Sequence, residues 1–394
     1  MVTGLDRVSI HGYRGAREVE LEPGAVCVLV GESSSGKSTV LAAVWTLLEA
    51  AAPMPTVADV SHGYTRIHVE ADSGGRTLFL DSKPPGTLNL NREGAPPALF
   101  FPAHLRVTSL LAPTDRHAKR AIAVVEERHT EDGGLSLVRA IAALADARIR
   151  GHVILIEEPE LYLSPPSQRH LHTQLHRLAA RGRNQVLYST HSPVFLGVDR
   201  LEQLVLVRHD VRTGATLLQP EELPRDQALR LFTELDAERA EIFLSRAVML
   251  VEGRTEKLAF PFVFRALGYD ADQEAIAIVD CAGKGNIPLF AEVCNACQIP
   301  YVVVHDRDAP RGQQPTEAEQ ISNEAIARTA GKRRTIALVP DFEGVAGLRA
   351  RRGKPAAAFK RFQDGNGDVP GALRQAVERI VASARRAPRT TRGA

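Results

Sequence analysis

Residues 31–38 read Gly31-Glu-Ser-Ser-Ser-Gly36-Lys37-Ser38 and match the phosphate-binding pattern G-x-x-x-x-G-K-[ST]. An apolar run over 25–30 predicts a strand before this loop, and residues 37–50 predict a helix after it. In such a loop, glycines let backbone N–H groups surround a phosphate, the lysine offsets its charge and the serine hydroxyl can ligate Mg²⁺. The stretch therefore predicts a nucleotide-binding α/β domain.

Two later segments supply the other parts that such a site needs. Four apolar residues over 153–156 predict a buried strand that ends in Glu157 and Glu158, which would hold the Mg²⁺ water shell and polarise the attacking water, respectively. A strand over 185–189 leads to His191, which by itself is more typical of a structural or solvated histidine but, after the loop and the acids, could reach a γ-phosphate. The predicted MgATP site comprises cofactor residues Gly31, Ser33, Ser34, Ser35, Gly36, Lys37, Ser38, Thr39 and Glu157, metal ligands Ser38 and Glu157, and catalytic residues Glu158 and His191.

Length and composition limit the class of protein. At ~150 residues per domain, 394 residues predict two or three domains. The net charge of +2 excludes a protein that coats polyanions by bulk charge, and 44% hydrophobic with 24% charged residues is typical of a soluble globular chain. No apolar run approaches the ~18 residues of a membrane span, and the first residues lack a signal-peptide layout. We therefore expect a cytoplasmic protein without a membrane contact.

Short apolar runs alternate with amphipathic stretches along most of the chain, which predicts parallel α/β architecture in two sheets. Runs over 7–10 and 25–30 are expected to pair. Alternating runs over 65–70 and 77–80 predict an antiparallel hairpin beside the main sheet. A second α/β series has strands expected at 247–251, 275–279, 301–304 and 335–339. We predict domains at 1–240 and 241–370, followed by a C-terminal helix and flexible basic tail at 371–394.

Acidic residues follow the strands of this second series. Glu252 and Glu256 follow the first, a glycine-rich loop at 283–286 follows the second, Asp306 and Asp308 end the third, and Asp341 and Glu343 follow the fourth. Each acid alone is more typical of a solvent-facing carboxylate. Together they would meet at one sheet edge, where several carboxylates can hold two Mg²⁺ or Mn²⁺ ions for phosphodiester hydrolysis.

The segments GESSSGKST, LIEEPELYL and YSTHSP resemble the ABC-type ATPase heads of structural-maintenance and recombination proteins. The resemblance implies ATP hydrolysis between two copies, each offering a signature helix to the other. Gly133-Gly134-Leu135-Ser136 is the candidate start of that helix, although its order departs from Leu-Ser-Gly-Gly-Gln. A long coiled-coil insertion is missing, which argues against a chromosome-organising protein.

The segments LVEGRTE, GKGN, HDRD and PDFEG resemble a Toprim domain, and together with the ATPase head they resemble the overcoming lysogenization defect (OLD) family of ATP-dependent nucleases over residues 5–365. The resemblance implies an N-terminal ABC-type P-loop ATPase domain and a smaller C-terminal Toprim domain. It also implies two metal ions and an assisting lysine, with Lys360 second to Lys354. The mapped metal ligands are Glu252, Glu256, Asp306, Asp308 and Glu343, and the mapped catalytic residues are Glu252, Asp306, Asp308 and Lys354.

Basic clusters at 332–334, 349–354 and 360–361 are expected to flank the acidic edge, although a solvated face is the ordinary explanation of each. Aromatic residues are 5% of the chain, so DNA would be held by largely sequence-independent backbone contacts. We thus predict an ATP-regulated, metal-dependent DNA endonuclease or nickase serving antiphage defence or DNA processing. The alternative is a non-cleaving ATP-dependent sensor or scaffold acting with a partner protein. A homodimer or higher oligomer is expected, although the family's helical dimerisation insert is short here.

Overall fold

The computed structural model describes residues 4–50, 52–103, 133–146, 148–196, 201–210, 212–309, 313–348, 354–363 and 368–387. Contacts divide the chain into an N-terminal unit, Met1–Leu223, and a C-terminal unit, Pro224–Pro388. The compact C-terminal unit thus begins before the junction expected at about 240. Helix α5 (Arg225–Glu234) explains the difference, because Arg230 Nη2 donates to Asn286 Oδ1 at 2.8 Å within that unit.

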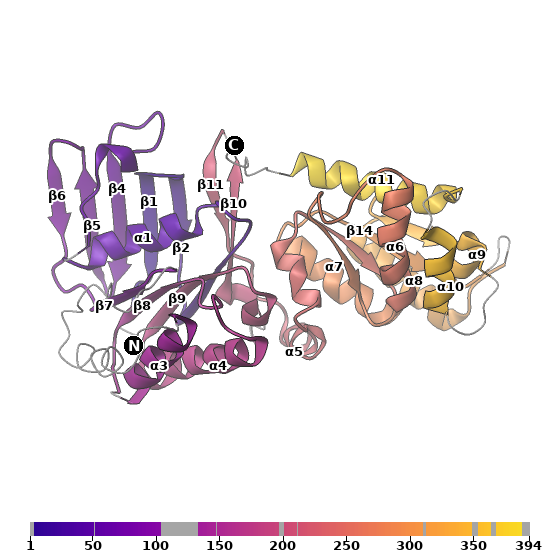
Figure 1. The fold of residues 1–394 in the computed structure, drawn as a ribbon, viewed down its shortest axis with the longest axis horizontal. Helices are drawn as coiled ribbons and strands as arrows, with labels where there is room; N and C mark the ends of the chain where they lie inside the picture. The colour runs from indigo at the N-terminus through magenta and orange to yellow at the C-terminus, as the bar shows by residue number, and fades with distance from the viewer. Residues whose placement is uncertain are drawn as a thin grey trace. The chain divides into compact units, whose positions relative to one another are not determined.

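The N-terminal unit contains two sheets with helix α1 (Lys37–Leu48) packed between them (Figure 1). One sheet is antiparallel in the order β2-β1-β4-β5-β6, and the other is parallel in the order β11-β10-β3-β9-β8-β7, except that β11 runs antiparallel to β10. The strands are β1 (Arg7–Tyr13), β2 (Ala16–Leu21), β3 (Val26–Val30), β4 (Ile67–Ser73), β5 (Arg76–Ser82), β6 (Leu88–Asn91), β7 (Ala98–Phe101), β8 (Val153–Glu157), β9 (Gln185–Thr190), β10 (Leu204–Asp210) and β11 (Gly214–Leu218).

The hairpin predicted around residues 73–75 is confirmed as β4 and β5, which pair antiparallel. The expected pairing of 7–10 with 25–30 is wrong. Strand β1 pairs with β2 and β4, whereas β3 pairs with β9 and β10 in the other sheet. Strand β2, which the prediction did not include, takes the place beside β1 that was expected for residues 25–30.

Two further helices of the N-terminal unit pack against each other near the parallel sheet, namely α3 (Gly133–Asp146) and α4 (Pro165–Gly182). Helix α3 therefore starts at the candidate signature segment, although the side chains of residues 133–136 lie outside the described part. Burial of α1 on most sides follows from its composition, because Val40, Leu41, Val44 and Leu47 face apolar residues from both sheets.

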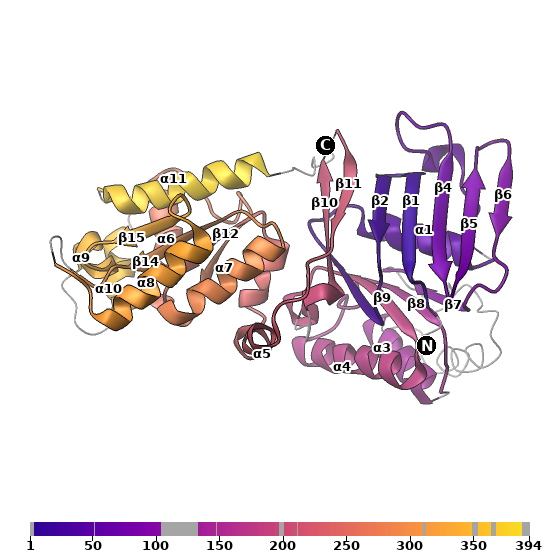
Figure 2. The same cartoon turned by 180° about the vertical axis from the view of Figure 1, so that it is seen from behind.

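The C-terminal unit is built on one parallel sheet in the order β13-β12-β14-β15. Helices α6, α10 and α11 share one apolar core with it, while α7 contacts β12 and β14 and α8 contacts β15 (Figure 2). The elements are β12 (Ala247–Val251), α6 (Arg254–Ala266), β13 (Ile276–Asp280), α7 (Ile287–Ala296), β14 (Tyr301–Asp306), α8 (Glu317–Ala330), β15 (Thr335–Leu338), α9 (Phe342–Ala346), α10 (Lys354–Phe362) and α11 (Gly371–Arg386).

All four strands predicted for this unit are present. Helix α11 belongs to its core, because Leu373, Val377, Ile380 and Val381 are buried there. The flexible tail expected after this helix, residues 388–394, lies outside the described part of the chain. Since the strands are parallel, residues that follow them gather at one edge of the sheet and residues that precede them gather at the opposite edge.

Candidate nucleotide and metal sites

The loop between β3 and α1 forms a phosphate cradle around Lys37. Its Nζ donates to the backbone oxygens of Gly31 at 3.0 Å and Glu32 at 2.9 Å, and the residue is 4% exposed. Burial lowers the pKa of Lys37 to about 8, although Glu158 and Glu160 oppose that shift. A buried ammonium held only by carbonyl oxygens is well suited to receive phosphate oxygens.

Two features of the loop favour a bound phosphate. Ser35 is buried and its Oγ has no hydrogen-bond partner, so a polar atom faces the loop interior without compensation. Gly36 has a φ of 112°, and a Cβ there would lie 2.9 Å from Ala215 Cβ. The backbone path around the cradle therefore requires glycine.

Gly31 offers the most direct test of the loop conformation. Its φ is +150°, and a Cβ added there would lie 2.1 Å from the backbone oxygen of Val207. We expect Gly31→Ala to lower the free energy of unfolding by about 2 kcal/mol or more, because strain and a backbone clash combine. It should also weaken ATP binding. Denaturant unfolding and nucleotide titration measure both effects. Gly371→Ala is the control, because a Cβ there meets nothing within 4 Å; equal stability of the two variants would contradict the prediction.

Glu157 lies at the end of β8 and reaches the first turn of α1. Its carboxylate accepts a hydrogen bond from the Ser38 side chain, and Glu157 Oε2 accepts the Ala103 N–H at 3.2 Å. Burial raises the pKa of Glu157 above its ordinary value. The structure thus brings the two predicted Mg²⁺ residues of the nucleotide site together.

Glu158 and His191 meet at the neighbouring strand ends, because β8 and β9 are adjacent. His191 Nε2 lies 3.6 Å from Glu158 Oε1, and Glu158 adopts a positive φ of 45°. Burial, followed by the charge of Lys37, lowers the pKa of His191. The histidine is therefore near both the cradle and the acid.

Sequence reasoning gave no role to Glu160, yet it fixes this corner of the site. Glu160 Oε1 accepts the backbone N–H of His191 at 2.6 Å. Burial raises the pKa of Glu160. Its place three residues after Glu157 was the available signal, and its contact with the backbone of His191 identifies it as a positioning residue.

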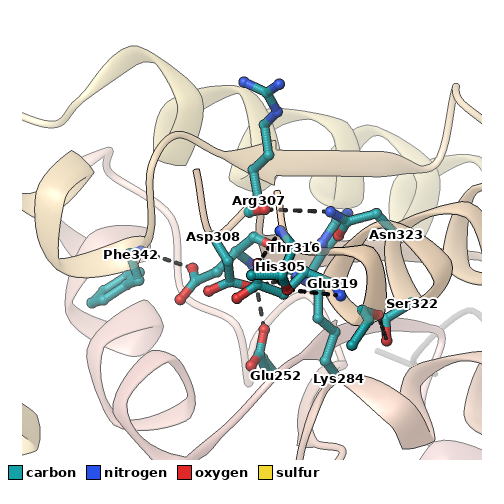
Figure 3. A network of polar contacts seen from close by, with 12 residues as sticks. Glu252, Lys284, His305, Arg307, Asp308, Thr316, Glu319, Ser322, Asn323 and Phe342 are labelled. Atoms are coloured by element: carbon teal, nitrogen blue, oxygen red, sulfur yellow. Dashed lines mark hydrogen bonds and ion pairs between the residues drawn. The ribbon is translucent and has the colours of Figure 1, made fainter. Parts of the chain in front are cut away.

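The carboxyl ends of β12 and β14 bring the second set of acids together (Figure 3). The Asp306 backbone N–H donates to Glu252 Oε2 at 3.4 Å, and Asp306 Oδ1 accepts the N–H of Phe342 at 2.7 Å. Glu256 lies in the first turn of α6 and is 7% exposed. Three carboxylates, two from the β12–α6 connection and one from the end of β14, therefore occupy one partly buried edge.

The electrostatics of this edge show an excess of negative charge. Burial, then the charges of Glu256 and Glu252, raises the pKa of Asp306 to about 8. Burial raises the pKa of Glu256 to about 7, with Glu252 and Glu343 adding to the shift. Like charges withdrawn from water disfavour ionisation unless a cation joins them, so the charge of the donor set fits a divalent metal ion.

Two lysines supply positive charge to the outer acids. Lys284, in the loop after β13, forms an ion pair with Asp308. Lys354 Nζ lies 2.8 Å from Glu343 Oε1, which draws Glu343 toward the start of α10. Lys354 thus lies beside Glu343, one of the proposed metal ligands. The sequence analysis gives Lys284 no role of its own within the glycine-rich loop. Its position between Gly283 and Gly285 is the signal that could have indicated a contact with the acids.

The positions of these side chains do not by themselves form a completed metal cage. In the described residues, no group of three or more histidine, cysteine or acidic side chains is arranged to hold a metal ion. The donor chemistry and charge fit Mg²⁺ or Mn²⁺. Lys284 and Lys354 each neutralise one acid that a metal would otherwise share.

One predicted basic cluster lies at the wrong edge for metal chemistry. Arg333 and Arg334 directly precede β15, whereas Asp306 ends the adjacent parallel strand β14. The parallel register therefore places these arginines opposite the acids. Residues 349–353 of the second cluster lie outside the described part, while Lys360 and Arg361 lie on α10.

The raised pKa of Glu256 predicts a pH effect on stability. Its unfolded carboxyl ionises near pH 4.5 and its folded form near 7, so the free energy of unfolding falls as pH rises through this window. We expect Glu256→Gln to gain about 2 kcal/mol at pH 8 without metal ions, because the amide carries no charge. The gain should shrink at pH 5. Urea unfolding at both pH values tests this, with the exposed Glu378→Gln on α11 as control; a gain independent of pH would contradict it.

A family model described as the Toprim domain of overcoming lysogenization defect (OLD) protein-like sequences matches residues 243–308. Over these residues, the chain is therefore similar to OLD-like Toprim domains. The match includes β12 and β14 and ends at Asp308, so it contains four of the five predicted metal ligands. A model described as an AAA domain matches residues 131–197, and one for a family of unknown function matches 3–58. The predicted combination of a P-loop ATPase domain and a Toprim domain is confirmed.

Whole-protein comparisons cover part of each relative. The OLD nuclease of Thermus scotoductus is 36% identical over 247 residues, which are 58% of this chain and 47% of that protein. The Old nuclease of Escherichia phage P2 is 26% identical over 186 residues, 44% of this chain and 31% of that protein. The SMC head domain from Thermotoga maritima is 13% identical with a TM-score of 0.36, covering 55% of this chain and 99% of that domain. The chain therefore spans about half or less of the curated relatives it matches.

ATPase and Toprim domains in general use a nucleotide and divalent metal ions. Within the described residues, no helix is long and apolar enough to cross a membrane.

Proposed function

We propose that this chain is an ATP-regulated, divalent-metal-dependent DNA endonuclease or nickase of the OLD type. The observation that carries the proposal is the gathering of Glu252, Glu256 and Asp306, with raised pKa values, at one edge of an OLD-like Toprim domain. Clustered carboxylates of this kind are the usual donors for ions that hydrolyse phosphodiesters. The similarity to two OLD nucleases supports the same reading.

The acidic residues of the Toprim domain would bind metal ions, and its basic residues would contact DNA. Glu252, Asp306 and Asp308 would hold two Mg²⁺ or Mn²⁺ ions, with Glu256 and Glu343 as further ligands. The ions would supply an activated water and stabilise the leaving oxygen. Lys354, held by Glu343, would then be positioned to face a DNA phosphate. Lys360 and Arg361 on the same helix would add sequence-independent backbone contacts.

The ATPase half would regulate cutting. Lys37 and Ser38 would hold MgATP together with Glu157, while Glu158 and His191 would act on the γ-phosphate. Hydrolysis would take place in a homodimer or higher oligomer, with the segment at 133–136 presented to the partner copy. A cytoplasmic role in antiphage defence or DNA processing is part of the proposal.

A second candidate is a non-cleaving ATP-dependent DNA-binding sensor or scaffold that acts with a partner protein. The pairing of Lys284 with Asp308 favours it, because a lysine then neutralises an acid that metal catalysis would need. It is also favoured because, among the described residues, no three histidine, cysteine or acidic side chains are arranged around one metal position. The two candidates differ in whether DNA is cut.

Incubation of purified protein with supercoiled plasmid and linear duplex separates the candidates. We expect nicking or degradation only with Mg²⁺ or Mn²⁺, and a rate that changes when ATP is added. Lys37→Ala should remove the response to ATP, because the cradle loses its ammonium. Intact DNA under every condition, with ATP hydrolysis present, would favour the sensor.

A further inference from the structure

A cavity lies at the edge of the Toprim sheet opposite the acids. It has a volume of about 980 Å³ and lies between the end of α7, the start of β14, the residues before β15, and α11. Its walls include Tyr301, the first residue of β14, and Arg334, which precedes β15. Because β14 and β15 are parallel, this is the edge opposite Asp306. The cavity therefore lies apart from the proposed cutting site.

Positive charge dominates the lining of this cavity. Four of its residues are arginines and one is acidic, namely Arg333, Arg334, Arg379, Arg386 and Glu378. Within the described part of the chain, no ion pair joins any of these guanidinium groups to a carboxylate. Clustered guanidinium groups without acidic partners repel one another, and an anion would relieve that repulsion.

Neighbouring groups hold two of the arginines in place. Arg334 Nη1 donates to Asn295 Oδ1 at 2.9 Å, and its guanidinium stacks over the ring of Tyr301 at 5.0 Å from the centroid. Arg379 Nη1 donates to the backbone oxygen of Arg333 at 3.0 Å. The hydrogen bonds use only Nη1 of each guanidinium and leave its other N–H donors available, and preorganised guanidinium groups suit phosphate oxygens.

The remaining walls combine apolar residues, among them Ile299, Pro300 and Val302, with the uncharged polar residues Asn295, Gln298, Gln375 and Ser383. Small-molecule sites combine apolar walls with a few charged or polar groups that orient the ligand, and the volume of this cavity is at the upper end of the range for such sites. The combination matches a ligand that has both an apolar, planar part and phosphate groups.

We propose that this arginine-lined cavity binds a phosphate-bearing ligand of nucleotide size. The phosphates belong either to a free nucleotide or to a nucleotide of a nucleic-acid strand that runs past the domain. Either ligand would contact the Toprim domain at the edge opposite Asp306 and without a metal ion.

Binding measurements on the full chain test this site apart from cleavage. The probes are a nucleoside 3′,5′-bisphosphate, followed by calorimetry, and a labelled single-stranded dodecanucleotide, followed by anisotropy. EDTA removes binding through metal ions, and a Lys37→Ala background removes binding at the phosphate cradle. Arg333→Ala/Arg386→Ala is the test variant, because both side chains are exposed and the Arg333 backbone oxygen that Arg379 uses is retained. Arg374→Ala/Arg328→Ala is the control, since it removes the same charge from exposed helix positions outside the cavity.

We expect the test variant to raise the dissociation constant of at least one probe about tenfold or more, because two charge-assisted contacts are lost. The control should change it less than about threefold, the range expected of general charge. Loss of bisphosphate binding would identify a free nucleotide as the source, and loss of oligonucleotide binding alone would identify a strand. Equal weakening in both double variants, or no weakening of either probe, would overturn the proposal.

Discussion

Asp306→Asn is expected to reduce metal-dependent DNA cleavage by about 100-fold or more, because metal ions supply several kcal/mol of transition-state stabilisation and the amide is a far poorer ligand. Asparagine has the same shape, and its amide oxygen can still accept the Phe342 N–H that Asp306 Oδ1 accepts at 2.7 Å. The loss would therefore reflect charge and not misfolding. ATP hydrolysis should be unchanged, since its residues belong to the other unit. Initial rates of plasmid nicking and of phosphate release measure the two activities.

Asp280→Asn is the matched control for this variant. Asp280 ends β13 beside Glu252's strand, and its Oδ1 accepts the Ala282 N–H at 2.7 Å, a contact that the amide oxygen can keep. It should cut DNA at close to the unaltered rate. Full cutting by Asp306→Asn, or equal loss in both variants, would show that the acidic edge does not act as proposed.

Glu158→Gln is expected to reduce ATP hydrolysis by roughly 10²–10⁴-fold while leaving ATP binding intact, because general-base assistance contributes that much. The Glu158 carboxylate lies just after β8, with Oε1 3.6 Å from His191 Nε2. The backbone N–H of Glu158 donates to the backbone oxygen of Ser189 at 2.9 Å. The backbone contact does not depend on the side chain, so the strand end should keep its shape. Steady-state phosphate release and nucleotide titration separate hydrolysis from binding.

Lys37→Ala provides the comparison for Glu158→Gln. It should lose binding as well as hydrolysis, because its Nζ is held at the cradle by Gly31 and Glu32. If Glu158→Gln hydrolysed ATP at the unaltered rate, the water-polarising role would pass to another group near His191. If it failed to bind ATP, the acid would be part of the binding site instead.

Much of the fold was predictable because its signals are local. The loop at 31–38 and the strands over 247–251 and 301–304 are defined by composition within a few residues, and the structure has them at nearly those bounds. The antiparallel sheet was harder to predict. Strand β2 (Ala16–Leu21) is short and carries charged residues on its exposed side, so its pairing with β1 depends on contacts that no single window reveals.

The candidate sites were predictable as residue types following strands, since parallel strands deliver those residues to one edge. What could not be predicted is which side chains pair there. Lys284 reaches Asp308 from a different strand connection, and Glu160 contacts the backbone of His191 across 31 residues. Arg333 precedes β15, so the predicted parallel direction of the strands already implied that it lies at the edge opposite Asp306, and the expectation that it flanks the acids overlooked this.

Titration of the metal-free full chain with Mn²⁺, followed by calorimetry, tests the central claim most directly. The account predicts saturable binding of about two ions per chain, with at least one lost in Asp306→Asn and both kept in Asp280→Asn. Saturable binding that survives unchanged in Asp306→Asn, or no saturable binding at all, would contradict a metal site at the acidic edge of the Toprim domain.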